Sequence, residues 1–267
     1  MTNVLREKLE SGAPIFGTFV TMTDPTAVEV AALAGFDYAI ADLEHAAIDI
    51  ETLQNHMRAA RARGIGLLVR VAGNVQHEIL RVLEAGAEGI MVPHVATRSD
   101  AERAVSAVRY APIGSRGIYD NTRAGDYSAH GLDGYRAYTE RANEEVVLVF
   151  LIEDEEGVVN AEQISAVKGV DVIAVGPADL SFSLGLYGSV GHPRIVAAAE
   201  QVRAACAQSG VRFALPPDHG TYPVPADQLI ANGQVFFFRG SDCGAMLDGM
   251  RQRLAVMKGS QPAVMHA

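Results

Sequence analysis

Eight short runs of β-forming residues alternate with alanine-rich stretches of helical period along almost the whole chain. This alternation is typical of parallel strands joined by crossover helices. The predicted strands are Ile15–Val20, Tyr38–Asp42, Leu67–Val71, Gly89–Val92, Val146–Ile152, Asp171–Val175, Arg212–Leu215 and Val235–Phe238. Eight such units predict a single α/β domain over residues 1–267, folded as a closed (β/α)8 TIM barrel.

Helices are expected between the strands, within a barrel core of residues 15–257 that precedes a flexible tail at 259–267. They are predicted at Pro25–Ala34, Glu51–Arg63, Gln76–Ala85, Arg98–Tyr110, Glu155–Val167, Pro193–Ser209, Pro225–Asn232 and Gly244–Met257. A doubly wound open sheet is the alternative, but no Gly-x-Gly-x-x-Gly turn follows any predicted strand. The barrel is therefore preferred.

Residues 111–143 interrupt this rhythm, because the segment is rich in Gly, Tyr, Asp and Arg and too long for an ordinary connection. It comes after the fourth predicted strand. We therefore expect a lid or substrate-contacting loop on the face where barrel enzymes place their active sites.

The formal charge of −10 argues against nucleic acid or an anionic membrane as partner, because both require basic surface. The first residues are charged rather than apolar, and no run approaches membrane-spanning length. We expect a cytoplasmic protein that binds small molecules, with local arginines for any anionic substrate.

Two apolar runs, one βα unit apart, each lead to a carboxylate: the fifth predicted strand ends at Glu153, and the sixth runs through Gly176-Pro177-Ala178 to Asp179. A buried carboxylate requires a partner or a cation. Two of them at neighbouring strand ends predict a divalent-metal site. The alternative is that each residue caps the following helix.

Other strand ends add polar residues to the same rim of the predicted barrel. The second strand ends in Asp42-Leu43-Glu44-His45, the third at Arg70, and the fourth leads to His94. An arginine, a histidine and several carboxylates suit a metal-assisted reaction on an anionic 2-oxo acid. Alternatively, His45 is a capping or packed histidine and Arg70 a structural ion-pair partner of Asp42 or Glu44.

The number and positions of the lysines limit the possible catalytic mechanisms. Only Lys8, Lys168 and Lys258 are present, and none ends a predicted strand. Schiff-base catalysis is therefore disfavoured, so an aldolase on this barrel would stabilise its enolate with a metal instead.

With these motifs in place, the chain resembles the metal-dependent (class II) pyruvate aldolases of the 4-hydroxy-2-oxoheptanedioate aldolase type, within the HpcH/HpaI aldolase and citrate lyase-like proteins. The likeness extends over residues 15–257. It rests on Gly35-Phe36-Asp37-Tyr38, Asp42-Leu43-Glu44-His45, Val69-Arg70, Glu84-Ala85-Gly86-Ala87, Val92-Pro93, Arg109-Tyr110-Ala111-Pro112, Gly114-Ser115-Arg116-Gly117, Ile152-Glu153 and Gly176-Pro177-Ala178-Asp179-Leu180-Ser181.

The resemblance implies that Glu153 and Asp179 bind the metal, Mg²⁺ or Mn²⁺ with Co²⁺ or Zn²⁺ as alternatives. It makes Arg70 the group that faces the pyruvyl oxygen, and His45 with Asp42 the acid/base pair. The implied reaction is cleavage of a 4-hydroxy-2-oxo acid to pyruvate and an aldehyde, as in the catabolism of aromatic or sugar acids.

The resemblance also implies a homo-oligomer, usually a hexamer with exchanged C-terminal helices, in which Glu84 completes the site of a neighbouring subunit. Independently of the family, the backbone N–H groups of Gly176, Ala178 or Asp179 can hold a substrate carboxylate at the start of the next helix.

Some segments depart from the family pattern. Leu43 replaces a common glycine, Leu151 stands where a glutamine is frequent, and residues 119–123 and 213–219 are unusual. We expect the two unusual segments to line the aldehyde side. Arg123 is a candidate for a distal carboxylate or a solvated loop residue, and His219 contacts substrate or caps a turn.

Two alternatives to the aldolase stay open. One is another metal-dependent carbon–carbon lyase or decarboxylase that acts on an oxo acid or an acyl thioester. The other is a non-catalytic barrel that serves as a binding module.

Overall fold

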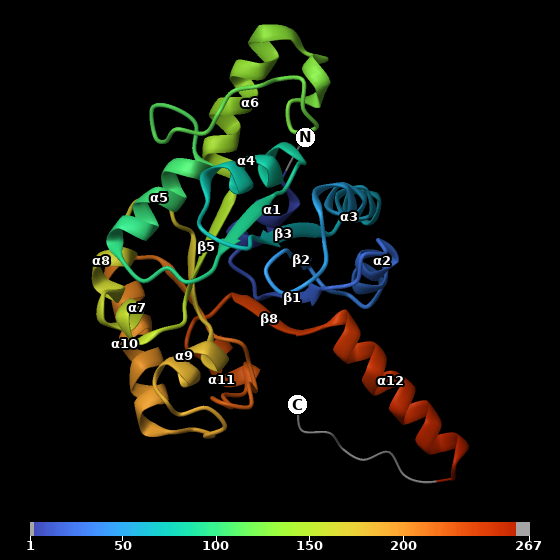
Figure 1. The fold of residues 1–267 in the computed structure, drawn as a ribbon, viewed down its shortest axis with the longest axis vertical. Helices are drawn as coiled ribbons and strands as arrows, with labels where there is room; N and C mark the ends of the chain where they lie inside the picture. Colours follow the sequence, from blue (N-terminus) through green and yellow to red (C-terminus); the bar gives the residue numbers. More distant parts are fainter. Residues whose placement is uncertain (1–2, 260–267) are drawn as a thin grey trace.

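The computed structural model describes residues 3–259 and contains eight parallel strands in one sheet (Figure 1). The order β7-β6-β5-β4-β3-β2-β1-β8 follows the chain around the barrel. The strands are β1 (Ile15–Val20), β2 (Tyr38–Asp42), β3 (Gly66–Arg70), β4 (Gly89–Val92), β5 (Val147–Ile152), β6 (Val172–Val175), β7 (Arg212–Ala214) and β8 (Phe236–Ser241). The predicted (β/α)8 barrel is confirmed, and seven of its strands begin and end within one residue of their predicted bounds.

Helices surround this barrel, and most occupy the predicted positions. They are α1 (Val4–Glu10), α2 (Thr26–Leu33), α3 (Ile50–Arg63), α4 (Gln76–Glu84), α5 (Arg98–Val108), α6 (Gly131–Glu145), α7 (Glu155–Val159), α8 (Ala161–Ser165), α9 (Pro177–Ser183), α10 (Pro193–Ser209), α11 (Ala226–Ala231) and α12 (Asp242–Met257), with a short 3₁₀ helix at Asp126–Ser128. The predicted helix Glu155–Val167 is two short helices that meet at Asn160.

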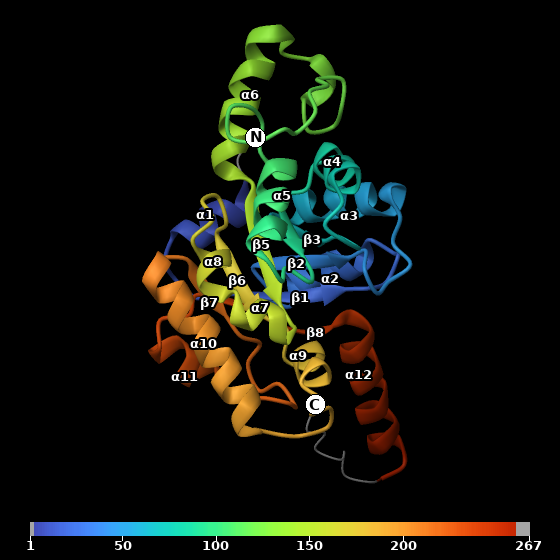
Figure 2. The same cartoon turned by 60° about the vertical axis from the view of Figure 1, so that its left-hand side comes forward.

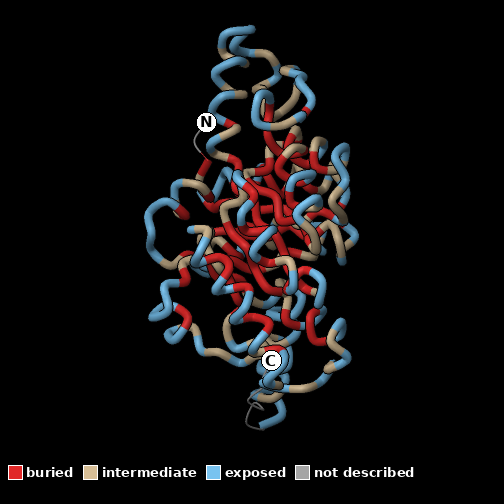
Figure 3. Tube along the Cα trace, turned by 90° about the vertical axis from the view of Figure 1, so that its left-hand side faces the viewer, coloured by how far each residue is buried: buried red, intermediate tan, exposed pale blue. Residues whose placement is uncertain are grey.

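The core has two layers. Inside the barrel, side chains such as Tyr38, Met91 and Phe236 are fully buried, whereas the outer layer packs the strands against the helices. Figure 3 shows this buried centre between exposed ends. At Gly17 an added Cβ would lie 2.3 Å from the Tyr38 ring, so only glycine leaves room for the tyrosine between β1 and β2.

A side chain joins the two ends of the sheet, β7 and β8. The buried Gln234 amide accepts a hydrogen bond from the Leu215 N–H (3.0 Å) and donates to the Leu215 carbonyl (2.9 Å) and the Phe236 carbonyl (3.0 Å). It thus satisfies backbone groups where the regular ladder stops, as buried backbone polar groups require.

The first helix closes the amino-terminal end of the barrel, which the sequence analysis did not predict. Leu5 and Leu9 of α1 are fully buried and belong to the inner layer of the core. The carboxylate of Glu88 accepts a hydrogen bond from the Leu5 N–H (3.0 Å). In the sequence, the charged residues around Leu5 and Leu9 obscure the apolar face of α1, which consists of these two leucines one helical turn apart.

The predicted lid over residues 111–143 is wrong in position. The segment follows α5 and leads through α6 into β5, so it connects a helix to a strand at the amino-terminal end of the barrel. Its second half is helical, and α6 projects from that end, away from α9 and α12 (Figures 1 and 2). The face on which barrel enzymes place their active sites lies at the other end of the strands.

The last described helix, α12, extends away from the barrel (Figure 1). None of its residues is buried, and Met246, Leu247, Met250 and Leu254 are exposed. The predicted flexible tail lies outside the described residues, except for Gly259. Among the described helices, none combines the length and apolarity needed to span a membrane.

Replacing Gln234 with Leu should destabilise the barrel. The substitution leaves the buried N–H and carbonyl of Leu215 without partners, which lowers the free energy of unfolding by roughly 2–4 kcal/mol. Urea denaturation measures the change. Gln228→Leu on the exposed side of α11 is the matched control, and equal stability of the two variants would contradict the role of Gln234.

Candidate active site

A cavity of about 290 Å³ opens at the carboxyl ends of the strands. Glu153 follows β5, and Asp179 lies in the first turn of α9 after β6. The lining residues come from six different strands or the loops after them: Phe19, Arg70, Leu151, Glu153, Gly176, Pro177, Ala178, Asp179, Pro216, His219, Phe238, Arg239 and Gly240. The cavity is at the small end of the range for ligand sites and suits a small metabolite.

Glu153 is buried, with only 4% of its side chain exposed. Its Oε1 accepts a hydrogen bond from the His94 N–H (2.8 Å) and lies 3.2 Å from His94 Nδ1. Burial raises the pKa of Glu153, and the like charges of Asp179 and Glu44 add to this against the opposing effect of His94. The groups around Glu153 therefore supply too little positive charge to offset its burial and the like charges of Asp179 and Glu44.

Gly176 makes room for this carboxylate. A Cβ at position 176 would lie 2.6 Å from Glu153 Oε2, closer than a real contact allows. Its N–H donates to the Ile152 carbonyl (3.1 Å), so the prediction that Gly176 N–H holds substrate is wrong. The N–H groups of Ala178 and Asp179 belong to the first turn of α9, which has no intrahelical carbonyl for them.

Arg70 is held between two carboxylates. Its Nε and Nη2 donate to Asp42 Oδ1 (3.0 Å) and Oδ2 (2.7 Å), and Nη1 lies 3.2 Å from Glu44 Oε2. The guanidinium also stacks over the Phe19 ring at 4.7 Å. Burial tends to raise the pKa of Asp42, but the bonds and charge of Arg70 outweigh it and hold the pKa below its ordinary value.

His45 lies at the same rim, with 63% of its side chain exposed. Asp42 Oδ1 accepts a hydrogen bond from the His45 backbone N–H (3.3 Å), whereas the His45 ring has Glu44 Oε2 3.6 Å from Nε2. Asp42 therefore fixes the backbone of the His45 loop, and Glu44 is the carboxylate closest to the ring.

Glu44 and His94 are site residues that the sequence analysis did not assign. Glu44 lies next to Arg70, next to the His45 ring and 3.3 Å from His94 Nε2. His94 has a left-handed backbone with φ of 52°, and its N–H points to Glu153. Both follow predicted strands, but only the fold shows that the loops after β2, β4 and β5 meet through these side chains.

Glu84 and Arg123 lie together at the amino-terminal end of the barrel. The Ala124 N–H donates to the Glu84 carbonyl (3.2 Å), and the Arg123 side chain packs against Gly86. Gly86 lies just before β4, whereas Glu153 follows the far end of the neighbouring β5. The expectation that Arg123 lines the aldehyde side of its own chain is therefore wrong.

The donor set fits a divalent cation that shares its coordination with substrate. Across residues 3–259, no group of three or more His, Cys, Asp or Glu side chains is placed to enclose a metal ion. Glu153 and Asp179 supply two carboxylates, and burial together with the charge of Asp179 raises the pKa of Glu153. Mg²⁺ is commonly held by one or two carboxylates together with substrate oxygens and water.

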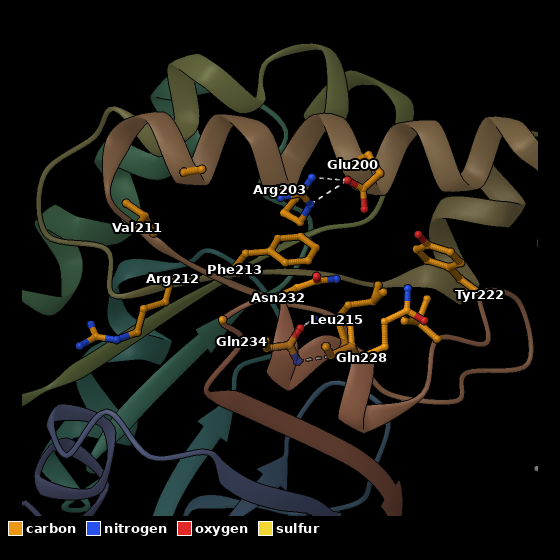
Figure 4. Close-up of a pocket in the computed structure, with 14 residues that line it drawn as sticks. Glu200, Arg203, Val211, Arg212, Phe213, Leu215, Tyr222, Gln228, Asn232 and Gln234 are labelled. Carbon is orange, nitrogen blue, oxygen red and sulfur yellow. Dashed lines mark hydrogen bonds and ion pairs between the residues drawn. The ribbon is translucent and has the colours of Figure 1, made fainter.

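A second cavity, of about 250 Å³, lies between α10 and α11 (Figure 4). Glu200 and Arg203 form an ion pair on its wall, beside Phe213 and Tyr222. None of the predicted site residues lines it. Five of the predicted site residues instead line the cavity at the strand ends: Arg70, Glu153, Gly176, Ala178 and Asp179.

The fold and the rim define a TIM-barrel enzyme with a paired-carboxylate site, and comparison with known proteins gives its family. Residues 16–244 match the model of the HpcH/HpaI aldolase/citrate lyase family. The chain belongs to this family. It is accordingly an enzyme, a carbon–carbon lyase, and the alternative of a non-catalytic binding module is wrong.

Similar curated proteins are aldolases. The chain is 32% identical to 2-dehydro-3,6-dideoxy-6-sulfogluconate aldolase of Pseudomonas putida, over 93% of this chain and 94% of that protein. It is 31% identical to hydroxypyruvate/pyruvate aldolase of Pseudomonas aeruginosa, over 98% and 95%.

Solved structures show the same fold. A family member from Burkholderia cenocepacia J2315 superposes with a TM-score of 0.86 at 31% identity, over 96% of this chain and all of that one. The citrate synthase SbnG superposes with a TM-score of 0.85 at 32% identity, over 97% and 98%.

Replacing Gly176 with Ala should displace the Glu153 carboxylate. The added methyl group overlaps Glu153 Oε2, which costs about 1–3 kcal/mol of unfolding free energy and disturbs the site. Thermal unfolding and lyase turnover measure the two effects. Gly249→Ala in α12 has open space around it and is the control. A Gly176→Ala enzyme with unchanged stability and turnover would contradict the close packing.

Proposed function

We propose that the protein is a divalent-metal-dependent aldolase that acts on small molecules in the cytoplasm. The reaction is the reversible cleavage of a 4-hydroxy-2-oxo acid to pyruvate, or a related 2-oxo acid, and an aldehyde. The observation that carries this proposal is one cavity that contains Glu153, Asp179 and Arg70 but none of the three lysines of the chain. An imine mechanism lacks its nucleophile there, whereas the carboxylate pair suits a cation.

Glu153 and Asp179 are the proposed metal ligands, for Mg²⁺ or Mn²⁺ in preference to Co²⁺ or Zn²⁺. The cation, when bound, would withdraw electron density from the keto group at C2, which would ease cleavage of the C3–C4 bond. The raised pKa of Glu153, caused first by burial and further by the charge of Asp179, supports this assignment, because a cation would stabilise both carboxylates in their charged form.

Substrate orientation falls to Arg70 and α9. We assign the Arg70 guanidinium to the oxygen that becomes the enolate oxygen of pyruvate, since Asp42 and Glu44 already hold it in place. The N–H groups of Ala178 and Asp179 are assigned to the carboxylate of the oxo acid, at the positive end of the helix.

Proton transfer is assigned to His45, with Asp42 fixing its loop. In the cleavage direction, His45 takes the proton of the 4-hydroxyl group, the C3–C4 bond breaks, and the bonding electrons form the enolate of pyruvate while C4 becomes the aldehyde. Protonation of C3 then gives pyruvate. The carboxylate of Glu44 lies 3.6 Å from Nε2 of this ring.

Assembly into a homo-oligomer is part of the proposal, and a hexamer is the form that the family resemblance implies. The α12 helix carries exposed Met246, Leu247 and Met250 without a buried residue, which suits exchange of this helix between subunits. Glu84 and Arg123 lie far from the cavity of their own chain, so any contribution to catalysis would be to another subunit.

A second candidate reaction follows from the similarity to the citrate synthase SbnG, 32% identical. In this alternative, the same residues act on another oxo acid or on an acyl thioester, as a lyase or a decarboxylase. Proton exchange at the methyl group of pyruvate distinguishes the aldolase from this alternative, because only a pyruvate aldolase should exchange these protons without an aldehyde.

Metal affinity tests the ligand assignment without relying on activity. Glu153→Gln keeps the shape of the side chain but removes one negative charge, so the affinity for Mn²⁺ should fall by at least about tenfold. Isothermal titration calorimetry measures it. Glu156→Gln, exposed on α7, is the control, and equal affinities of the two variants would exclude Glu153 as a ligand.

Pyruvate release from a 4-hydroxy-2-oxo acid should stop when a chelator removes the metal and return when Mn²⁺ is added. Turnover that is insensitive to the chelator would contradict the role of the metal.

Replacing Arg70 with Ala should lower turnover by about 100-fold, because the donor to the enolate oxygen is lost. An Arg70→Ala protein that loses its fold, as measured by circular dichroism, would indicate that Arg70 is a structural ion-pair partner.

A further inference from the structure

The loop after β7 and the last part of β8 place two nitrogen-bearing residues, His219 and Arg239, in the lining of the catalytic cavity. They share it with Arg70 and Glu153, and the reaction proposed above assigns no role to either. Both come from strands that the carboxylate pair does not use, so they form a separate wall of the site.

A β-bulge brings Arg239 to this wall. Pairing of β1 with β8 advances from Gly17 opposite Phe238 to Phe19 opposite Ser241, so β8 contains one extra residue there. Gly240, with φ of +64°, supplies the left-handed conformation of the irregularity.

The bulge accounts for the place of Arg239 in the cavity lining. Phe236 and Phe238 face the inside of the barrel and Phe237 the outside, so Arg239 would face outward in a regular strand. It instead lines the cavity. Bulges near active sites commonly redirect a side chain in this way.

His219 is a neutral hydrogen-bond donor at the same wall. Its Nδ1 accepts a hydrogen bond from the Thr221 N–H (3.2 Å), so the ring proton is on Nε2. Burial lowers the pKa of His219, and the positive charge of Arg239 lowers it further. Asp218, with φ of 48°, provides the tight turn that precedes the histidine.

We propose that Arg239 and His219 bind a negatively charged group on the aldehyde portion of the substrate. Within the cavity, Glu153, Asp179 and Arg70 are assigned to the metal and the pyruvyl portion, which leaves this wall for the other end of the molecule. A guanidinium beside an N–H donor is suited to a carboxylate or phosphate. At about 290 Å³ the cavity limits the aldehyde to a short chain.

This inference rests on the proposed aldolase function and adds the class of aldehyde. It concerns binding of the aldehyde only, so Arg239 and His219 are specificity residues without a part in proton transfer.

Matched aldehydes test the inference in the condensation direction with pyruvate and Mn²⁺. Glyoxylate is compared with glycolaldehyde, and glyceraldehyde 3-phosphate with glyceraldehyde. The unaltered enzyme should have a kcat/KM at least tenfold higher for the anionic member of one pair, and the pair that responds distinguishes carboxylate from phosphate.

Arg239→Val should lower the ratio of kcat/KM for the anionic aldehyde to kcat/KM for its neutral counterpart at least tenfold, mainly through the KM of the anionic aldehyde. Arg239→Lys should restore part of this preference. Arg194→Val is the control, because Arg194 is exposed on α10 and paired with Glu155 outside the cavity. Thermal unfolding verifies that each variant folds. If Arg239→Val does not fold, the Arg239→Lys and His219→Asn ratios decide.

The outcomes separate the two levels of the proposal. An unaltered enzyme that exchanges the methyl protons of pyruvate but prefers neutral aldehydes would overturn the role of Arg239 and His219 alone. An unchanged ratio in folded Arg239 variants would do the same. Absence of both proton exchange and condensation would instead overturn the aldolase assignment.

Discussion

A buried carboxylate with too little positive charge around it is the feature on which the site depends. Glu153 is 4% exposed, and the like charges of Asp179 and Glu44 add to the effect of burial on its pKa. Protein groups relieve this only in part, through His94. In the function proposed above, a cation supplies the missing positive charge, and a loss of stability in exchange for binding is a common compromise in enzymes.

The barrel makes this arrangement possible by holding loops from many strands at one rim. Its amino-terminal end is filled by Leu5 and Leu9 of α1, and its seam is joined by Gln234. The strand ends are thereby fixed, and the charged groups at the carboxyl rim can be kept in strained or repulsive positions. The left-handed backbone of His94 is one such position.

Within the rim, the charges divide the cavity by function. Arg70 is neutralised by Asp42 and Glu44 and kept in one orientation. Arg239 is directed to another wall by a bulge, beside a histidine. The two arginines thus suit the two ends of a substrate with negative charge at both, and this follows from backbone geometry as much as from residue type.

The strand bounds could be predicted because buried parallel strands are short apolar runs that end in polar residues, as at Val92 and Ile152. The carboxylate pair and Arg70 could be proposed as site residues for the same reason, since each stands where a strand ends or shortly after it. Helix α1 was not predicted because its two buried leucines, surrounded by charged residues, give only a weak helical periodicity in the sequence. The lid predicted at residues 111–143 was placed at the wrong end of the barrel because the segment was taken to follow β4. It follows α5, and a connection from a helix to the next strand lies at the amino-terminal end of the strands.

The sequence alone determined the barrel, the family and the presence of carboxylates and an arginine at strand ends, because these depend on local pattern and order along the chain. Only the tertiary structure decided which loops meet. It placed Glu44 between Arg70 and His94, put Arg123 at the opposite end from the cavity, and brought Arg239 into the cavity lining. These positions depend on strand register and on one extra residue in β8, which no local pattern encodes.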